Sequence, residues 1–401
     1  MNPKLDALKL YPFERLSSLL DRIHPPTQLN QIDLSIGEPK YLPSSFVRSK
    51  LQENVNLIQH YPTLRGSVEL RETIKSWLVK RYKLNPDSLN VETQILPVNG
   101  SREALFSFTQ ACLDVSKKDP LVLMPNPFYQ IYEGAAILAN ATPVFLATTE
   151  ENDFLPDFSL VPGSFWDDCQ MVYICSPGNP TGKVFTRQKY YELLTLSLKH
   201  DFVIAADECY SEIYQNEKFP PIGLLEIAQD FGNTDYKNCI VFHSLSKRSN
   251  VPGLRSGFVA GDEELLKGFY KYRTYHGNSM PLPTQQASIE CWKDEEHVLA
   301  NREGYRKKFK EVYEILSPVL ELDIPEATFY LWLKLPMDDD EKFAQELFRT
   351  QNVIVLPGSY LSRITGGNRS PGSGYVRLAL VASLEDCIKA AKRIRSFIQA
   401  M

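Results

Sequence analysis

Short runs of apolar and β-branched residues recur through the middle of the chain, and several of them lack alternation with polar residues. Strands that helices cover on both faces have this continuous apolar character, as in a largely parallel sheet. Stretches with helical spacing of apolar positions lie between the runs, at 101–115, 186–200 and 262–275. The alternation predicts a large α/β domain with a mostly parallel seven-stranded sheet between helices. The predicted strands are 93–98, 120–125, 142–147, 170–176, 202–207, 239–245 and 256–261.

The pattern changes after HGNSMPLP, residues 276–283. A long charged helical stretch at 295–320 is followed by short apolar runs, FYLWLKL, VIVLPG and YVRLALV, with helical segments between and after them. This mixture predicts a smaller α+β domain, and a chain of 401 residues is long enough for two cores. We expect an N-terminal segment that joins the small domain, a large domain and a small C-terminal domain, with bounds 1–35, 36–283 and 284–401.

Composition and charge exclude several classes of partner. Hydrophobic residues make up 43% and charged residues 23% of the chain, which is ordinary for a soluble globular protein. The net charge of −5 gives no electrostatic reason to bind nucleic acid or an anionic membrane. No window approaches the ~18 uninterrupted apolar residues of a membrane span, and the N-terminus lacks a signal-peptide pattern. We therefore expect a cytoplasmic protein with no nucleic-acid or membrane partner.

The cysteines do not indicate a metal site or disulfides. All seven are scattered, mostly within apolar runs, and none forms a CxxC pair. None of the six histidines lies at metal-ligand spacing from another. We expect reduced, buried thiols and no metal.

Polar residues follow four of the predicted strands directly. Ligands in open α/β sheets bind at the carboxyl ends of the strands, so these positions carry more weight than polar residues elsewhere. After 93–98 comes NGSREA, which opens a helix, and after 170–176 comes the rigid turn PGNPTG. The other two strands end in Asp207, with Tyr210 close behind it, and in Ser244, Ser246 and Lys247.

Each of these groups alone has an ordinary structural explanation: a helix cap, a turn or a solvated lysine. Together they place an anion site, an oriented amide, a carboxylate, a phenol and an amine on one edge of the sheet. These are the groups that a phosphorylated cofactor with a cationic ring nitrogen, a phenolic oxygen and an aldehyde requires. The pattern therefore indicates an enzyme rather than a binding module.

The ordered motifs NGSREA, CSPGNPTG, DECY and SLSKRSNVPGLRSG, followed by YVRLAL, resemble those of the fold type I, class I/II aminotransferases, which use pyridoxal 5′-phosphate. The resemblance extends from SIGEP at 35–39 to Arg377. It implies an aspartate aminotransferase-like fold and a catalytic set of Lys247, Asp207 and Tyr210. Lys247 would bind the cofactor aldehyde and act as general base, and Asp207 would pair with the ring nitrogen.

The same resemblance implies the remaining contacts. Tyr129 would stack on the cofactor ring, while Asn179 and Tyr210 would bind its phenolic oxygen. The phosphate would take donors from Ser101, Arg102, Ser244 and Arg255. Tyr61 would reach the phosphate of a neighbouring subunit, which implies a homodimer with shared active sites. Arg377 would bind the substrate α-carboxylate, with Gly37 allowing close backbone approach.

The segments YPFERL (11–16), SIGEP, QHYPTLRGSVELR (59–71) and LPVNGSREALFSFTQ (96–110) are most similar to N-succinyldiaminopimelate aminotransferases of bacterial lysine biosynthesis. The implied reaction converts N-succinyl-LL-2,6-diaminopimelate and 2-oxoglutarate to N-succinyl-2-amino-6-oxopimelate and glutamate. Such a substrate carries further carboxylates. Arg273, before GNSMPLP, is the candidate for a distal carboxylate contact.

Three alternatives stay open. Aminotransferases for aspartate, aromatic amino acids, kynurenine or LL-diaminopimelate share the same core residues. A pyridoxal-phosphate C–S lyase shares the lysine and the aspartate. A non-catalytic half of a transcription regulator is disfavoured, because no helix-turn-helix pattern precedes residue 35 and because the catalytic set is complete.

Overall fold

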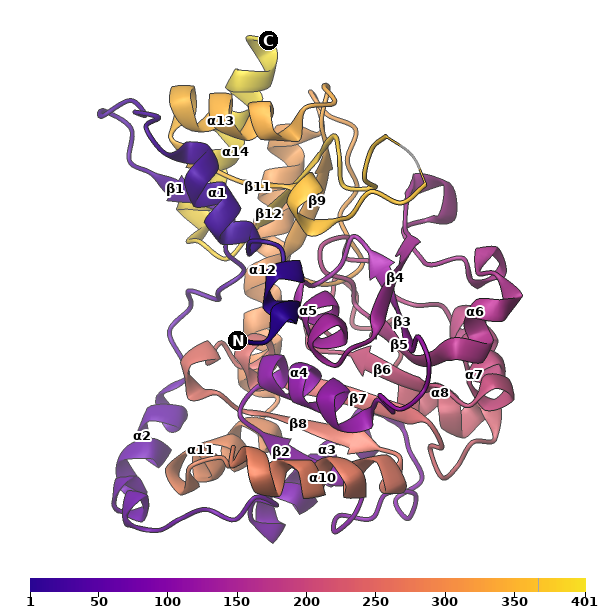
Figure 1. Ribbon diagram of the computed structural model, residues 1–401. Helices are drawn as coiled ribbons and strands as arrows, with labels where there is room; N and C mark the ends of the chain where they lie inside the picture. Colours follow the sequence, from indigo (N-terminus) through magenta and orange to yellow (C-terminus); the bar gives the residue numbers. More distant parts are fainter. Residues whose placement is uncertain (367) are drawn as a thin grey trace.

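The computed structural model of the chain describes residues 1–366 and 368–401. Its larger unit is built on a seven-stranded sheet with the order β2-β8-β7-β6-β5-β3-β4 (Figure 1). β8 is antiparallel to both of its neighbours, and the other pairs are parallel. The seven predicted strands and the predicted fold class are thereby confirmed. The strands are β2 (Ile95–Val98), β3 (Leu121–Asn126), β4 (Thr142–Ala147), β5 (Cys169–Cys175), β6 (Val203–Asp207), β7 (Cys239–Ser244) and β8 (Gly257–Gly261).

Helices cover both faces of this sheet, which explains why its strands are apolar throughout. Neighbouring residues of β6 belong to different cores, one on each face of the sheet: Ala205 lies in one and Ala206 in the other. One face carries α4 (Ser101–Cys112), α5 (Ile131–Leu138) and α10 (Glu263–His276). The other carries α3 (Val68–Tyr82), α7 (Arg187–His200), α8 (Leu224–Phe231) and α11 (Leu282–Lys293).

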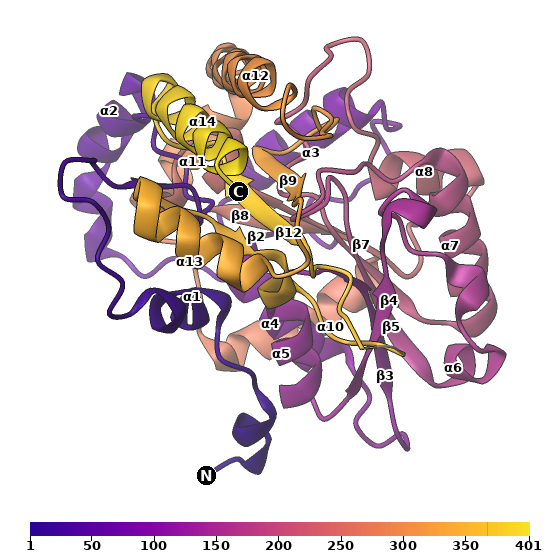
Figure 2. The same cartoon turned by 90° about the horizontal axis from the view of Figure 1, so that it is seen from above.

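The smaller unit combines an antiparallel sheet with three long helices (Figures 1 and 2). Its strands are β9 (Tyr330–Lys334), β11 (Leu356–Pro357) and β12 (Tyr375–Ala379), in the order β11-β12-β9. The helices are α12 (Glu296–Leu316), α13 (Asp340–Gln351) and α14 (Leu384–Gln399). The N-terminal segment packs here, because β1 (Ile32–Asp33) pairs with β10 (Val353–Ile354) and α1 (Pro12–Leu20) contacts α13 and β11.

The boundary expected at residue 283 needs a correction. α11 packs against α3 and α2 (Ser45–Glu53), and its residues Ala287, Ile289 and Trp292 belong to the core of the large unit. The change of pattern at 276–283 marks the turn between α10 and α11, not a change of domain. The passage to the small unit is made by α12, whose far half packs on α14.

The remaining elements are short. Among the described residues, no helix combines the length and the apolar character that a membrane span needs. Two further α-helices are α6 (Gly163–Asp168) and α9 (Leu245–Arg248), and the 3-10 helices are η1 (Pro3–Ala7), η2 (Val55–Gln59), η3 (Glu150–Asn152), η4 (Phe158–Leu160), η5 (Pro252–Leu254) and η6 (Gly358–Leu361).

Candidate active site

The carboxyl ends of β5, β6 and β7 lie side by side and form the floor of a cavity of about 230 Å³. Asn179 follows β5, Asp207 ends β6 and Lys247 follows β7, so the parallel strands bring the three residues to one edge. The small unit and the N-terminal segment supply the opposite wall. The lining residues are Tyr11, Pro12, Phe13, Ile36, Gly37, Ser101, Arg102, Tyr129, Gln130, Asn179, Asp207, Cys209, Tyr210, Lys247, Tyr330, Leu361 and Arg377.

Lys247 presents its amine to the cavity from α9, a helix of only four residues. Its Nζ donates to the carbonyl oxygen of Gly37 at 2.6 Å. Burial lowers the pKa of the Lys247 amine to about 8, and the nearby guanidinium groups of Arg377 and Arg255 act in the same direction. About a tenth of the amine is therefore neutral at pH 7, far more than for an ordinary lysine, as a nucleophile or base requires.

Asp207 is a buried carboxylate held by two donors. The hydroxyl of Tyr132 donates to its Oδ2 at 2.7 Å, and the backbone N–H of Cys209 donates to its Oδ1 at 3.3 Å. Burial raises the pKa of the Asp207 carboxyl, and these hydrogen bonds oppose the rise by favouring the ionised form. The hydrogen bond from Tyr132 thus stabilises the negative charge on Asp207, which would be needed to pair with a protonated ring nitrogen.

Sequence reasoning missed Tyr132. It lies three residues beyond Tyr129, at the start of α5, and its ring stacks on Tyr173 with a centroid distance of 4.4 Å. The spacing in NPFYQIY puts both tyrosines on one side of a helical turn, and that spacing was the available signal.

We expect Tyr132→Phe to lower kcat by roughly tenfold to hundredfold. The substitution removes a hydrogen bond to a buried charged group, which is worth about 1.5–3 kcal/mol. Steady-state turnover by the cofactor-loaded protein measures the effect. Tyr173→Phe is the matched control, since the Tyr173 hydroxyl donates to the carbonyl of Leu105 and does not contact Asp207. Equal kcat values for the two variants would contradict the role given to Tyr132.

Arg377 reaches the cavity from β12 in the small unit. Its guanidinium donates to Asn179 Oδ1 at 2.9 Å and to the carbonyl oxygen of Ser35 at 2.7 Å. Its Nε is buried and has no hydrogen-bond partner within the described part of the chain. The group lies 4.2 Å from the ring centre of Tyr330, whose hydroxyl is 3.0 Å from that of Tyr210. Arg377 therefore retains donor capacity for an anionic ligand.

The anion end of the cavity is formed at the start of α4. Ser101 is the first residue of this helix, and its Oγ lies 3.0 Å from the Cys209 thiol. Gly100 has a positive φ of 86°, and a Cβ there would lie 2.3 Å from the Arg255 guanidinium. Only glycine therefore allows Arg255 to lie so close to the backbone at the start of this helix.

Of the other proposed phosphate contacts, Arg102 lines the cavity, whereas Arg255 and Ser244 are not among its lining residues. Arg102 lines the cavity and also a neighbouring hollow of about 690 Å³, which Arg255 lines as well. The Arg255 guanidinium donates to the carbonyls of Pro252 and Asn99. Ser244 lies behind the wall, where its hydroxyl accepts from the N–H of Ser246. Ser101, Arg102 and Arg255 are thus grouped, whereas Ser244 is turned toward the backbone.

Two predicted site residues lie away from the cavity. Tyr61 is fully exposed and is not among the residues that line the cavity. Arg273 is fully buried, and its guanidinium donates to both carboxylate oxygens of Glu103, at 3.0 and 3.1 Å, and to the carbonyl of Asn278. The expected distal carboxylate contact of Arg273 is therefore corrected: α10 faces α4, and Glu103 already neutralises this cation.

Several lining residues had no assigned role in the sequence interpretation. Tyr330 and Leu361 come from the small unit, and Gln130 from the segment before α5. Tyr11, whose ring lies 5.1 Å from the Arg102 guanidinium, brings the N-terminal segment to the cavity. No local pattern marks these residues, because long-range packing alone places them there.

Comparisons with known proteins agree with this architecture. The chain matches the family model for aminotransferase class I and II over residues 30–394. A solved aminotransferase from Neisseria meningitidis is 44% identical, with a TM-score of 0.94 over 99% of both chains. A probable N-succinyldiaminopimelate aminotransferase from Thermus thermophilus is 28% identical, with a TM-score of 0.83 over 96% of this chain and 100% of that one. An LL-diaminopimelate aminotransferase of Aquifex aeolicus is 32% identical over 370 residues, 91% of each chain.

The fold and the cavity define a cofactor-dependent enzyme of the α/β class. The chain belongs to the aminotransferase class I and II family, whose members use pyridoxal phosphate. The residues present fit this cofactor, since a buried carboxylate, an amine of lowered pKa and the donor-rich start of α4 line one cavity. The family resemblance and the cofactor predicted from the sequence are confirmed.

Proposed function

We propose that this chain is the aminotransferase that acts on N-succinyl-LL-2,6-diaminopimelate with 2-oxoglutarate, yielding N-succinyl-2-amino-6-oxopimelate and glutamate, in bacterial lysine and diaminopimelate biosynthesis. The observation that supports the proposal is that Lys247, Asp207 and Arg377 line one cavity in a member of the aminotransferase class I and II family.

The residues of the cavity have different roles in the proposed transamination. When bound, pyridoxal phosphate supplies an aldehyde that binds amines and a ring that accepts electrons. Lys247 Nζ would hold that aldehyde and would move the proton at the α-carbon of the amino-acid donor. Asp207 would keep the ring nitrogen protonated, and Arg377 would orient the donor α-carboxylate. Tyr129 is proposed to stack on the ring, Asn179 and Tyr210 to hold its phenolic oxygen, and Gly37 to line the carboxylate site.

The wall of the cavity supports a donor whose distal amine is acylated. Among its described residues, Asp207 is the only carboxylate, and the ring nitrogen requires it. A free distal ammonium would find no second carboxylate among these lining residues, and burying an unpaired charge is costly. A further carboxylate outside this set is Glu38, whose charge acts to raise the pKa of the Lys247 amine. The Tyr11 hydroxyl can donate a hydrogen bond to the amide or the carboxylate of a succinyl arm, whereas Gln130 Nε2 already donates to the carbonyls of Phe128 and Tyr360.

LL-diaminopimelate is the second candidate donor. The Aquifex aeolicus relative bears that activity in its name and is 32% identical over 370 residues. The two donors differ in the charge of the distal nitrogen, so the cavity wall is the feature that should discriminate between them. Other amino-acid donors and C–S lyase chemistry share the same core residues.

The proposal includes a homodimer with shared active sites. Tyr61 is 101% exposed, Ile58 three residues before it is 73% exposed, and Leu42 in the preceding segment is 88% exposed. Such large apolar side chains are available to a second copy of the chain.

A half-reaction tests the choice of donor. Protein loaded with pyridoxal phosphate is mixed with N-succinyl-LL-diaminopimelate alone, and the visible absorbance of the bound cofactor is followed. 2-Oxoglutarate is then added. We expect the absorbance to fall and to return, at a lower donor concentration than is needed with LL-diaminopimelate, glutamate or aspartate.

The other outcomes are distinct. A response at lower concentration with LL-diaminopimelate would favour the second candidate and overturn the acyl-donor assignment. Release of pyruvate and ammonia from S-substituted cysteines, without a need for an oxo acid, would favour a lyase. Lys247→Ala protein in the same assay provides the blank.

A further inference from the structure

The helix that carries Lys247 is capped from outside. α9 has four residues, too few to satisfy its own final carbonyl groups. The Nδ2 group of Asn301 in α12 donates to the carbonyl oxygens of Lys247, at 3.2 Å, and of Arg248, at 3.3 Å. Asn301 is 7% exposed, so no solvent would easily replace this donor. The backbone at Lys247 is thus held by a helix that is distant in the sequence.

The orientation of the Asn301 amide is fixed by a second side chain. Asn250 Nδ2 donates to Asn301 Oδ1 at 2.7 Å, which leaves the Asn301 nitrogen facing α9. One turn earlier on α12, His297 Nε2 lies 2.8 Å from the Ser249 hydroxyl. α12 therefore contacts the end of α9 and the residues that follow it at two successive turns.

The next turn of α12 supports the other end of the lysine. Tyr305 packs against Phe329, with ring centres 5.4 Å apart. The Phe329 ring centre lies 5.3 Å from Lys247 Nζ. One face of α12 therefore positions both the backbone of Lys247, directly, and the surroundings of its amine, through Phe329.

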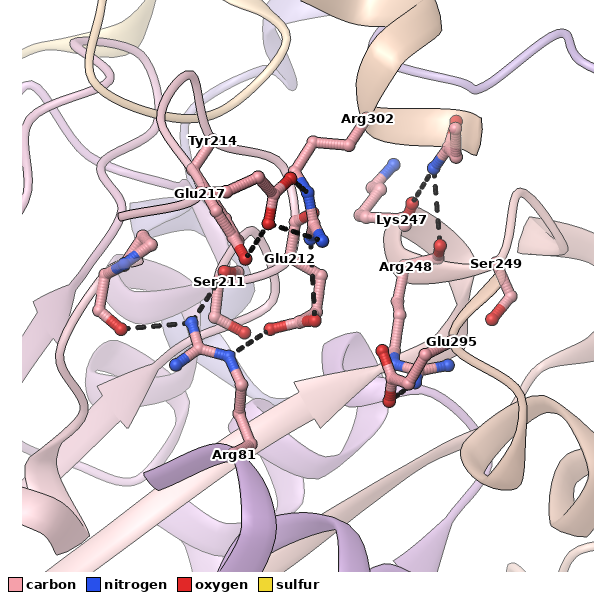
Figure 3. A network of polar contacts seen from close by, with 12 residues as sticks. Arg81, Ser211, Glu212, Tyr214, Glu217, Lys247, Arg248, Ser249, Glu295 and Arg302 are labelled. Atoms are coloured by element: carbon pink, nitrogen blue, oxygen red, sulfur yellow. Dashed lines mark hydrogen bonds and ion pairs between the residues drawn. The ribbon is translucent and has the colours of Figure 1, made fainter. Parts of the chain in front are cut away.

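This part of α12 is itself anchored to the large unit (Figure 3). Arg302 donates to Glu217 at 2.7 Å and to the carbonyl of Glu212 at 2.9 Å, and Glu212 pairs with Arg81 of α3 at 2.7 Å. Further along, α12 packs on α14 of the small unit. The residue that caps α9 therefore lies on the element that joins the two units.

We propose that Asn301 is a positioning residue for Lys247: by capping α9 it sets where Nζ lies relative to Asp207, Tyr210 and the phosphate donors. The inference rests on the function proposed for Lys247. Because α12 continues into the small unit, the same contact links the placement of the lysine to the packing of that unit.

The test compares Asn301→Ala with Asn301→Asp, which keeps the size and shape of the side chain but places oxygen where the nitrogen donates. Three quantities are measured: kcat and KM for the donor, the pH midpoint of the visible absorbance of the bound cofactor, and the rate at which cofactor-free protein takes up pyridoxal phosphate. We expect kcat to fall about tenfold to hundredfold, as for other misplaced catalytic groups, with KM changing less. The midpoint should shift by about half a pH unit or more.

Gln94→Ala is the matched control. Gln94 is also a buried amide, and it donates to the backbone carbonyl of Gly261. Gly261 ends β8 on the side opposite Gly257, which pairs with Ser244 beside the cavity. This variant should lose stability and keep the wild-type midpoint and kcat. A folded Asn301 variant of either kind with wild-type midpoint, uptake rate and kcat would overturn the inference. If instead Lys247→Ala keeps the pH transition, the assignment of Lys247 fails, which is a separate result.

Discussion

Lys247→Ala should abolish turnover, lowering kcat by about ten-thousandfold or more, because one substitution removes both the amine that binds the cofactor and the base that moves the α-proton. The cavity loses only the side chain beyond Cβ, and Asp207, Ser101 and Arg102 remain in its wall. Pyridoxal phosphate should therefore still bind, but without a covalent bond to protein. Steady-state turnover, and retention of the cofactor after borohydride reduction, denaturation and gel filtration, measure the two parts of the prediction.

Lys267→Ala serves as the control for this variant. Lys267 lies on α10, its side chain is 74% exposed, and its pairing with Glu264 is a surface contact of small energetic value. It should show wild-type turnover. Activity within tenfold of wild type in Lys247→Ala would contradict the mechanism.

Asp207→Asn should lower kcat by roughly 10²–10³-fold. The amide keeps the shape of the carboxylate but not its charge, so a protonated ring nitrogen loses its electrostatic support when the donor is deprotonated. Tyr132 and the N–H of Cys209 would still hold the side chain, which limits structural change. The measurement is kcat for the donor half-reaction, together with the affinity for pyridoxal phosphate.

Glu208, the carboxylate next to Asp207 in the sequence, provides the control. Glu208 is 1% exposed and points to the opposite face of the sheet, where it accepts from the N–H of Leu224 at 2.7 Å and lies 3.2 Å from His243. Glu208→Gln removes an equally buried charge without touching the cavity. Its kcat should stay within a few fold of wild type even if its melting temperature falls. Similar losses in both variants would indicate a general effect of buried charge and not a role of Asp207 at the ring.

The strands of the sheet and the residues on the floor of the cavity could be predicted from the sequence. Strands buried on both faces need continuous apolar runs, and the residue that ends such a run necessarily lies at the sheet edge, as Asp207 and Lys247 do. The predicted run at 142–147 coincides with β4, and the one at 239–245 overlaps β7 to within one residue.

Contacts between distant segments could not be predicted in this way. Arg273 has the appearance of a free cation at a helix end, and only the packing of α10 on α4 shows that Glu103 neutralises it. Tyr132 and Asn301 are ordinary helix residues until the fold brings them to Asp207 and to α9. The domain boundary was misplaced because a turn between two helices of one unit has the same composition as a linker.

The most direct test of the central claim is to map the covalent attachment of the cofactor in the wild-type protein. Loaded protein is reduced with borohydride, digested and analysed by mass spectrometry. We expect the phosphopyridoxyl label on the peptide containing residues 245–248, at Lys247 alone. A label on another lysine, or no label in protein that turns over its donor, would contradict it.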